Sequence, residues 1–490
     1  METSPTRTDK RHRHSRVVLN RSTGKGNLDY IVDYNGSSYT LSAVAVMVKK
    51  TSKRNARSFT DCFKLRRTPL QRRPARTIVT RSQSHIRGGL FRRLPSELFD
   101  MILDQMSVRD LSIFSMVSKE VNGQVRAYIS TLAWRKRMMN ENFHHFVSFK
   151  QTFIVGHYKD LSLLFKRCTL LLPTKERLKF IFSKISQIPC FSMDQCELPG
   201  CLGLSCYGVF FQTLIAGWDR LECHRVFNFL CELTHLLKNI EAVLIERPGL
   251  KRYQERQIRL YCRHVLLDCW PNQPVKKFWL NLLLNPWPLV SQARLLFILY
   301  GPSCPDGTLN WHSLVEMELP RRSLWEVANA IHLLFGDTDL EDQSNQSMLT
   351  ILEELIVVPQ QWHVDNVARL LVLCESSLCY NILASKAING RLFEVSRLLV
   401  HIVLVCEEDN YHVSWAVKLV HRIYNLLRTA AEKFRFIQQL ESMFSMVTME
   451  MLEFSVTGNN VGDRETLQSL HFFLNSTARF HAKLLQMFVR

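Results

Sequence analysis

Four cysteines lie close together in a stretch rich in proline and glycine, and thiolates at this density could hold a zinc ion. They are Cys190, Cys196, Cys201 and Cys206. Zinc sites usually take their cysteines in pairs separated by two to four residues. The intervals here hold five, four and four residues, so only the later two reach the upper limit of that spacing. We therefore expect reduced thiols in this segment, with no metal and no cofactor.

A row of arginines is the second group that could do chemistry. Its members follow one another at steps of four, three and four residues, which places them on one face of a helix. Guanidinium groups bind phosphate and carboxylate bidentately, so the row suggests the binding of an acidic or phosphorylated substrate. The alternative, which the pattern alone favours, is a solvated basic face partly screened by Glu255. The row consists of Arg252, Arg256, Arg259 and Arg263.

Catalytic motifs are missing from the sequence. It has no phosphate-binding G-x-x-x-x-G-K-[ST], no H-E-x-x-H and no G-x-S-x-G. The nearest match, Gly203-Leu-Ser-Cys-Tyr-Gly208, has the wrong spacing for a nucleophile elbow. We therefore expect a protein that is not an enzyme.

The elements that would position these residues are helices. From Leu94 to the C-terminus apolar residues recur every three or four positions, and no alternating pattern of comparable length predicts a strand. Residues 325–334 and 362–371 share Trp, Val, Asn and a closing Leu-Leu at an offset of 37, a period typical of helix-pair repeats. Two unrelated amphipathic helices would explain this echo equally well. The sequence predicts an all-α fold with a large, irregular, solenoid-like helical domain over residues 141–490.

The N-terminal fifth differs in charge from the rest. Residues 1–93 hold 22 Lys and Arg against five Asp and Glu, whereas the remainder is almost neutral. We expect a mostly disordered basic tail over residues 1–90, with a small β-hairpin over 28–48 around an Asn-Gly turn. The basic clusters suit nuclear import or contact with nucleic acid, and import is favoured because no nucleic-acid-reading motif accompanies them.

The setting is predicted to be intracellular, in the nucleus, the cytoplasm or both. The N-terminus lacks a signal-peptide pattern, and no apolar run approaches the roughly 18 residues of a membrane helix, so no membrane partner is expected. The 14 cysteines fall mostly within apolar helical patterns, as is typical of reduced, buried thiols.

Residues 94–134 predict three short helices. Pro95 stands near the first start, and Ser107 and Ser118 are placed to cap the second and third. Apolar residues line one face of each helix. Three helices of this size cannot enclose all of these side chains, so the following domain or another protein must cover some of them.

This segment resembles the F-box family of proteins. The order and spacing of its matching positions carry the resemblance, and they read Leu94-Pro95, Glu97-Leu98, Ile102-Leu103, Asp110-Leu111, Val117-Ser118-Lys119, Leu132 and Trp134. The resemblance implies a short three-helix F-box, which we place at residues 91–140. It also implies a substrate receptor of an SCF-type cullin–RING ubiquitin ligase, in which other subunits transfer ubiquitin and this chain links a target protein to a Skp-type adaptor.

The same resemblance implies which side chains contact the adaptor. They are Leu94, Pro95, Leu98, Ile102, Leu103, Leu111 and Val117. The alternative for these residues is that they only pack a small helical domain. Two other functions stay open, namely a nuclear nucleic-acid-associated protein that acts through its basic tail and a helical scaffold outside any ligase.

Overall fold

The computed structural model describes residues 94–139, 143–144, 148–193, 201–335, 342–409, 411–457 and 464–489. The chain divides into two units, Met1–Ser84 and His85–Arg490, and every described residue belongs to the second. The predicted basic tail and the hairpin predicted over residues 28–48 therefore lie outside the described residues.

Four short helices open the described chain, and hydroxyl side chains fix where three of them begin. Ser107 and Ser118 each accept a hydrogen bond at 3.1 Å from the backbone N–H three residues on, as their positions in the sequence predict. Thr131 caps a fourth helix in the same way, so the segment extends one helix beyond the predicted three. The helices are α3 (Ser96–Asp104), α4 (Val108–Phe114), α5 (Lys119–Tyr128) and α6 (Leu132–Met138).

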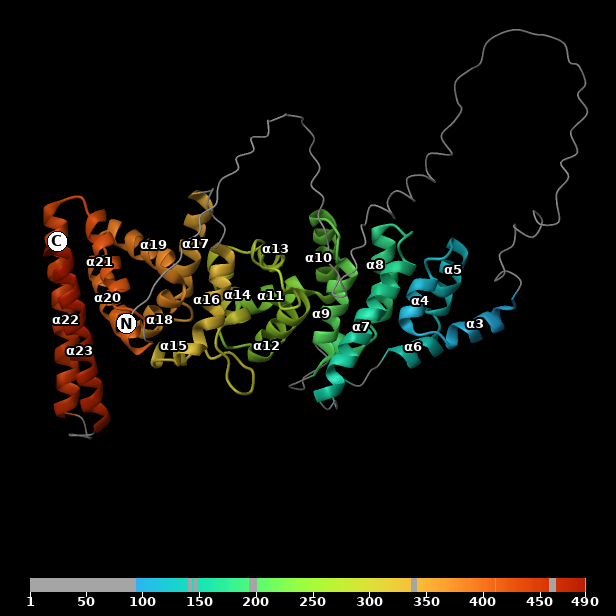
Figure 1. Cartoon of the computed structure of the whole chain (residues 1–490), viewed down its shortest axis with the longest axis horizontal. Coiled ribbons are helices and arrows are strands. Elements are labelled where there is room, and N and C mark those ends of the chain that lie inside the picture. The colour runs from blue at the N-terminus through green and yellow to red at the C-terminus, as the bar shows by residue number, and fades with distance from the viewer. Residues whose placement is uncertain are drawn as a thin grey trace, which may run out of the picture. The chain divides into compact units, whose positions relative to one another are not determined.

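The rest of the described chain is also helical, and the prediction of an all-α fold is confirmed (Figure 1). The first group of helices is α7 (Ser148–Cys168), α8 (Thr174–Ile185), η2 (Pro189–Phe191), α9 (Gly203–Ile215), α10 (Arg220–Thr234), α11 (Leu236–Ile245), α12 (Arg252–Tyr261), the π-helical turn η3 (Cys262–Leu267), α13 (Gln273–Leu284) and α14 (Leu289–Tyr300). The second group is α15 (Ser313–Glu316), η4 (Arg321–Leu324), α16 (Trp325–Phe335), α17 (Asp342–Leu355), α18 (Val364–Leu373), α19 (Glu375–Ile388), α20 (Leu392–Glu408), α21 (Ser414–Leu426), α22 (Ala430–Thr457) and α23 (Arg464–Val489).

Helices that are neighbours in the chain, or next neighbours, pack against one another. α7 packs on α9, α12 on α14, α16 on α18, α18 on α20 and α20 on α22. The two echoing sequence segments thus fall on α16 and on the start of α18, which are in contact. A succession of local contacts is the packing of stacked helical repeats, in which each unit buries its apolar face against the next.

The first four helices share an apolar core with the helices that follow. α4 and α5 pack on α7, and the rings of Trp134 and Phe165 meet edge to face with 6.2 Å between their centroids. Polar contacts reinforce this junction, since Arg167 donates to the Ser112 hydroxyl at 3.0 Å and the Asn122 amide donates to the Arg167 carbonyl at 3.4 Å. The downstream helices therefore cover one side of the F-box-like segment and fix its orientation.

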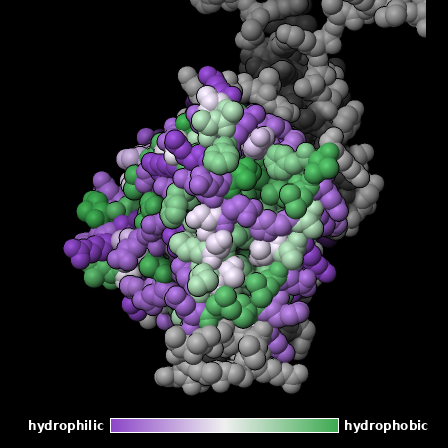
Figure 2. Space-filling view, turned by 90° about the vertical axis from the view of Figure 1, so that its left-hand side faces the viewer, coloured by the Kyte–Doolittle hydropathy of each residue, from purple (hydrophilic) through white to green (hydrophobic). Residues whose placement is uncertain are grey.

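Some apolar side chains are exposed to solvent on the C-terminal helices. Phe434, Met449 and Leu485 are exposed on α22 and α23, and Figure 2, which faces this end, shows green patches separated by hydrophilic residues. Within the described ranges, no helix has both the length and the apolar character needed to cross a bilayer.

Candidate functional site

The first helix of the F-box-like segment is apolar on two faces. Phe99 and Leu103 point inward and are buried. Leu98, Met101 and Ile102 lie on the opposite face, with 47%, 63% and 42% of their surface exposed. Exposing several large apolar side chains on one short helix is unfavourable in water, so this face is suited to contact with another protein.

A second exposed apolar group lies at the end of α4. Ile113, Met116 and Val117 are 54%, 52% and 65% exposed, and two backbone hydrogen bonds form the tight turn that carries the last two. Phe114, between them, turns inward with its ring centroid 6.1 Å from that of Phe99. We refer to the exposed side chains of α3 and of this turn together as the outward apolar strips. They comprise Leu98, Met101, Ile102, Ile113, Met116 and Val117.

The seven residues predicted to contact an adaptor divide between the surface and the core. Pro95, Leu98, Ile102 and Val117 are exposed and Leu94 is half-buried, whereas Leu103 and Leu111 have no exposed surface. Leu103 and Leu111 are enclosed by their own domain in this structure, so the exposed members of the set are the ones open to a partner. Sequence reasoning missed Met101, Ile113 and Met116, although Met101 stands one helical turn after Leu98.

A polar contact fixes the end of α3 beside the outward apolar strips. The Tyr128 hydroxyl donates to the Asp104 carboxylate, and Arg137 reaches both, at 2.7 Å from Asp104 Oδ1 and 2.5 Å from Tyr128 Oη. Burial, together with the hydrogen bond to Asp104, raises the pKa of Tyr128 to about 12. The phenol thus stays protonated and keeps donating, which joins α3, α5 and α6.

Two arginines of the predicted row are committed to contacts within the protein. Arg259 Nη1 donates to the carbonyls of Ile298 and Gly301 at 3.2 and 2.6 Å. Arg263 pairs with Glu326 at 2.5 Å and with Asp268 at 2.8 Å. Burial is the main cause that lowers the pKa of Arg259 to about 10, and this guanidinium stays charged at neutral pH.

The other members of the row also have neighbours within the chain. Arg252 Nε donates to the Gly249 carbonyl at 3.2 Å, and the guanidinium of Arg256 lies against Gly307. Glu255, which the alternative placed on a solvated face as a partial screen of these charges, is instead completely buried. Sharing one helix face therefore does not bring the four guanidinium groups to a common open site.

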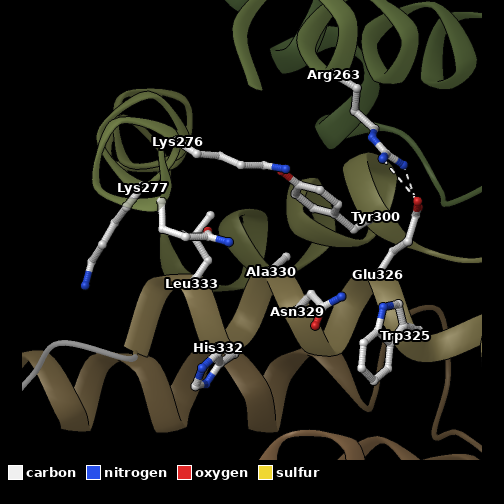
Figure 3. Close-up of a pocket in the computed structure, with 11 residues that line it drawn as sticks. Arg263, Lys276, Lys277, Tyr300, Trp325, Glu326, Asn329, Ala330, His332 and Leu333 are labelled. Atoms are coloured by element: carbon white, nitrogen blue, oxygen red, sulfur yellow. Dashed lines mark hydrogen bonds and ion pairs between the residues drawn. The ribbon is translucent and has the colours of Figure 1, made fainter. Parts of the chain in front are cut away.

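A pocket of about 560 Å³ opens beside Arg263, between α13 and α16 (Figure 3). Lys276 and Lys277 reach it from α13, and Trp325 and His332 line it from α16. Lys276 pairs with Asp268 at 3.0 Å, and Trp325 keeps 53% of its surface exposed. Cations beside an exposed indole can bind an acidic side chain and the apolar surface next to it.

Two of the four clustered cysteines come together in the structure, along with a histidine that sequence reasoning missed. The ligand atoms of His144, Cys190 and Cys201 all lie within 4.8 Å of one another. Cys206 is buried on α9, and Cys196 lies outside the described residues. His144 is 46 positions before Cys190, so no local spacing could have indicated it.

Most of the chain is similar to known protein families and to known proteins. The family model described as "F-box domain" matches residues 91–126, and that described as "FBXO47, ARM repeats" matches residues 233–490. F-box only protein 47 of Mus musculus is 44% identical over 404 residues, which is 81% of this chain and 89% of that protein. The Homo sapiens protein of the same name is 43% identical over the same shares. No solved structure matches the chain.

Proposed function

The chain belongs to the F-box only protein 47 family, and from this premise we propose that it is a substrate receptor of an SCF-type ubiquitin ligase. Its outward apolar strips bind a Skp-type adaptor, through which cullin and RING subunits attach. The helical domain binds the target protein. The chain is non-catalytic and acts by bringing the target close to the transferring subunits in a fixed orientation.

The observation that carries this proposal is the exposure of the outward apolar strips. Six large apolar side chains of α3, α4 and the turn after α4 stay about half exposed, although Phe99, Leu103 and Leu111 beside them are buried. Fully burying one such side chain contributes about 1.5–3 kcal/mol, so covering its exposed half gives about 1 kcal/mol. Six of them supply roughly 6 kcal/mol of the gross attraction that has to exceed the cost of association.

Co-purification with the Skp-type adaptor tests the proposal. The variant Leu98→Asp/Ile102→Asp places two charges in the contact, and we expect at least a tenfold loss of adaptor affinity. The matched control is Leu221→Asp/Ile245→Asp, which makes the same change at exposed apolar positions on α10 and α11 and should bind normally. Undiminished binding by the first variant would refute the proposal and favour a helical scaffold outside any ligase.

For the target we propose an acidic or phosphorylated segment, bound in the pocket between α13 and α16. The predicted arginine row supports this assignment only in part, because Arg263 lines the pocket but is paired with Glu326 and Asp268, and Arg259 is occupied by backbone carbonyls. Lys277 and Trp325 replace the other arginines as the groups that a target would meet.

The basic tail is proposed to direct import into the nucleus. Deletion of residues 1–90 should leave adaptor binding intact and shift the protein towards the cytoplasm. If the deletion instead abolished an interaction with nucleic acid while the protein still entered the nucleus, the alternative of a nucleic-acid-associated protein would gain support.

A further inference from the structure

Three connecting segments, of which the one with the histidine is distant in the sequence, bring one imidazole and two thiols together. His144 lies in the connection between α6 and α7, Cys190 is in η2, and Cys201 precedes α9. His144 Nε2 is 3.1 Å from Cys190 Sγ, and all three ligand atoms lie within 4.8 Å of one another. Around a tetrahedral zinc ion, with Zn–S near 2.3 Å and Zn–N near 2.0 Å, such atoms stand roughly 3.5–3.8 Å apart. Small side-chain rotations would bring the three atoms to these separations.

The backbone at the start of α9 lies very close to η2, which carries Cys190. A Cβ on Gly203 would lie 2.4 Å from Cys190 Cβ and 2.8 Å from the Cys190 carbonyl oxygen, so only glycine lets the start of α9 approach η2 this closely. The Gly203 N–H also donates to Cys201 Sγ at 3.3 Å. An amide donor of this kind stabilises a thiolate and orients it, as the outer contacts of metal ligands do.

The segment that carries the histidine is held in place independently. The Leu202 N–H donates to the Phe143 carbonyl at 3.5 Å. The Phe143 ring packs at centroid distances of 5.5 and 5.6 Å from Tyr158 and Phe191, and Phe191 stacks on Tyr207 at 4.8 Å. Phe143 and Phe191, the chain neighbours of His144 and Cys190, are therefore held in one aromatic cluster. His144 itself is exposed, so an ion can reach it from solvent.

We propose that His144, Cys190 and Cys201 bind one Zn²⁺ ion, with a water molecule in the fourth position. Two soft thiolates and an imidazole select zinc over hard cations such as Mg²⁺ or Ca²⁺, which prefer oxygen ligands. Binding converts two thiols to thiolates and releases their two protons to solvent. The expectation of metal-free thiols, drawn from spacing within 190–206, considered cysteines alone and could not include His144.

The ion would tie the connection after α6 to the connection between α8 and α9. It would join the end of the F-box to the first helices of the domain that follows. This site does not depend on the proposed ligase function, and adaptor binding can be lost without loss of zinc.

Metal content of the full-length protein, purified in reducing buffer, tests the site. We expect one zinc per chain by elemental mass spectrometry, and less than one fifth of that in His144→Ala, Cys190→Ser and Cys201→Ser. Cys223→Ser and His224→Ala make the same changes on α10, outside the cluster, and should retain the metal. Absence of zinc from the wild type, or equal zinc in all variants, would overturn the proposal.

A second measurement uses only the wild-type chain, so that a misfolded variant cannot obscure the result. After removal of metal by a chelator, Zn²⁺ should protect Cys201 from alkylation at least tenfold and leave Cys223 unchanged. Cobalt in place of zinc should give the near-ultraviolet absorption of thiolate-to-metal charge transfer. A Cys190–Cys201 disulfide in the freshly purified protein, or alkylation of Cys201 that ignores zinc, would refute the site.

Discussion

Replacing Glu255 with alanine should destabilise the region around α12, because this buried carboxylate satisfies three groups at once. The Trp311 indole N–H donates to Oε2 at 2.9 Å, and the Gly249 N–H donates to Oε1 at 3.0 Å. The Arg294 guanidinium lies 3.6 Å from Oε1, with only 8% of its side chain exposed. Glu255→Ala leaves an enclosed positive charge and two enclosed donors without this acceptor.

The size of the effect follows from these contacts. Removing one partner of a buried ion pair costs about 3–5 kcal/mol, and each buried donor left without an acceptor costs about 1–3 kcal/mol. Arg294 also donates to the carbonyls of Leu244 and Glu246, which keeps part of its charge satisfied. Counting about 1 kcal/mol for each of the three groups that lose the carboxylate, we therefore expect a loss of about 3 kcal/mol, against a total stability of about 5–15 kcal/mol for a typical domain.

The assay should be local, because stacked helices need not unfold in one step. In hydrogen–deuterium exchange, the peptides that contain Gly249 and Trp311 should exchange roughly 100-fold faster in Glu255→Ala, since about 1.4 kcal/mol corresponds to a factor of ten. Arg225→Ala removes an exposed ion pair with Glu222 and should change exchange little. Glu255→Leu/Arg294→Leu should recover part of the loss. Unchanged exchange at Gly249, or losses from the single variants that simply add, would refute this reasoning.

Three further outcomes are expected. Gly208→Ala should destabilise the protein by about 1–3 kcal/mol, because the new Cβ would lie 2.1 Å from the His264 carbonyl oxygen. The control Gly156→Ala has open space around the new Cβ and should be neutral or slightly stabilising. The melting temperatures of the two variants check this. Burial raises the pKa of Asp365, but the hydrogen bond and charge of His401, 2.5 Å away, outweigh it and hold that pKa below its usual value. The stabilisation of the folded state by ionised Asp365 is therefore present above the pKa of about 3.9 that an unfolded aspartate has. It is lost as the pH falls through the lower pKa of Asp365 in the folded protein. His401→Phe should thus lower the urea midpoint of unfolding at pH 6 more than at pH 3.5. Lys277→Glu and Trp325→Ala should each weaken target binding about tenfold in pull-downs and leave adaptor binding unchanged, with Lys238→Glu as control; undiminished binding would place the target elsewhere.

Local chemistry made part of the structure predictable. Apolar spacing indicated the all-α fold, and Ser107 and Ser118 cap the helices that their positions predicted, because capping depends on residues only three apart. The side of α3 that faces the core was harder to predict. Both of its faces are apolar, so periodicity alone could not show that Leu103 points inward and Ile102 outward.

Contacts between residues that are distant in the sequence could not be predicted from sequence patterns. Glu255 looked like a surface charge among arginines, and its burial depends on Arg294 of α14 and on Trp311 in the connection between α14 and α15. Arg259 likewise satisfies the carbonyl of Gly301, beyond the end of α14. Charge patterning describes a single helix and does not reveal which neighbour will cover it.

The neighbour-to-neighbour packing of the helices has a consequence for damaged forms of the protein. Among the described residues, the main contacts of α22 and α23 are with each other and with α20 and α21, so a change there is not passed directly to the opening segment around α3 and α4. On the proposed function, a chain altered at this far end would still bind the adaptor through the outward apolar strips. Loss of adaptor binding is therefore expected from changes around α3 and α4 and not from changes around α22 and α23.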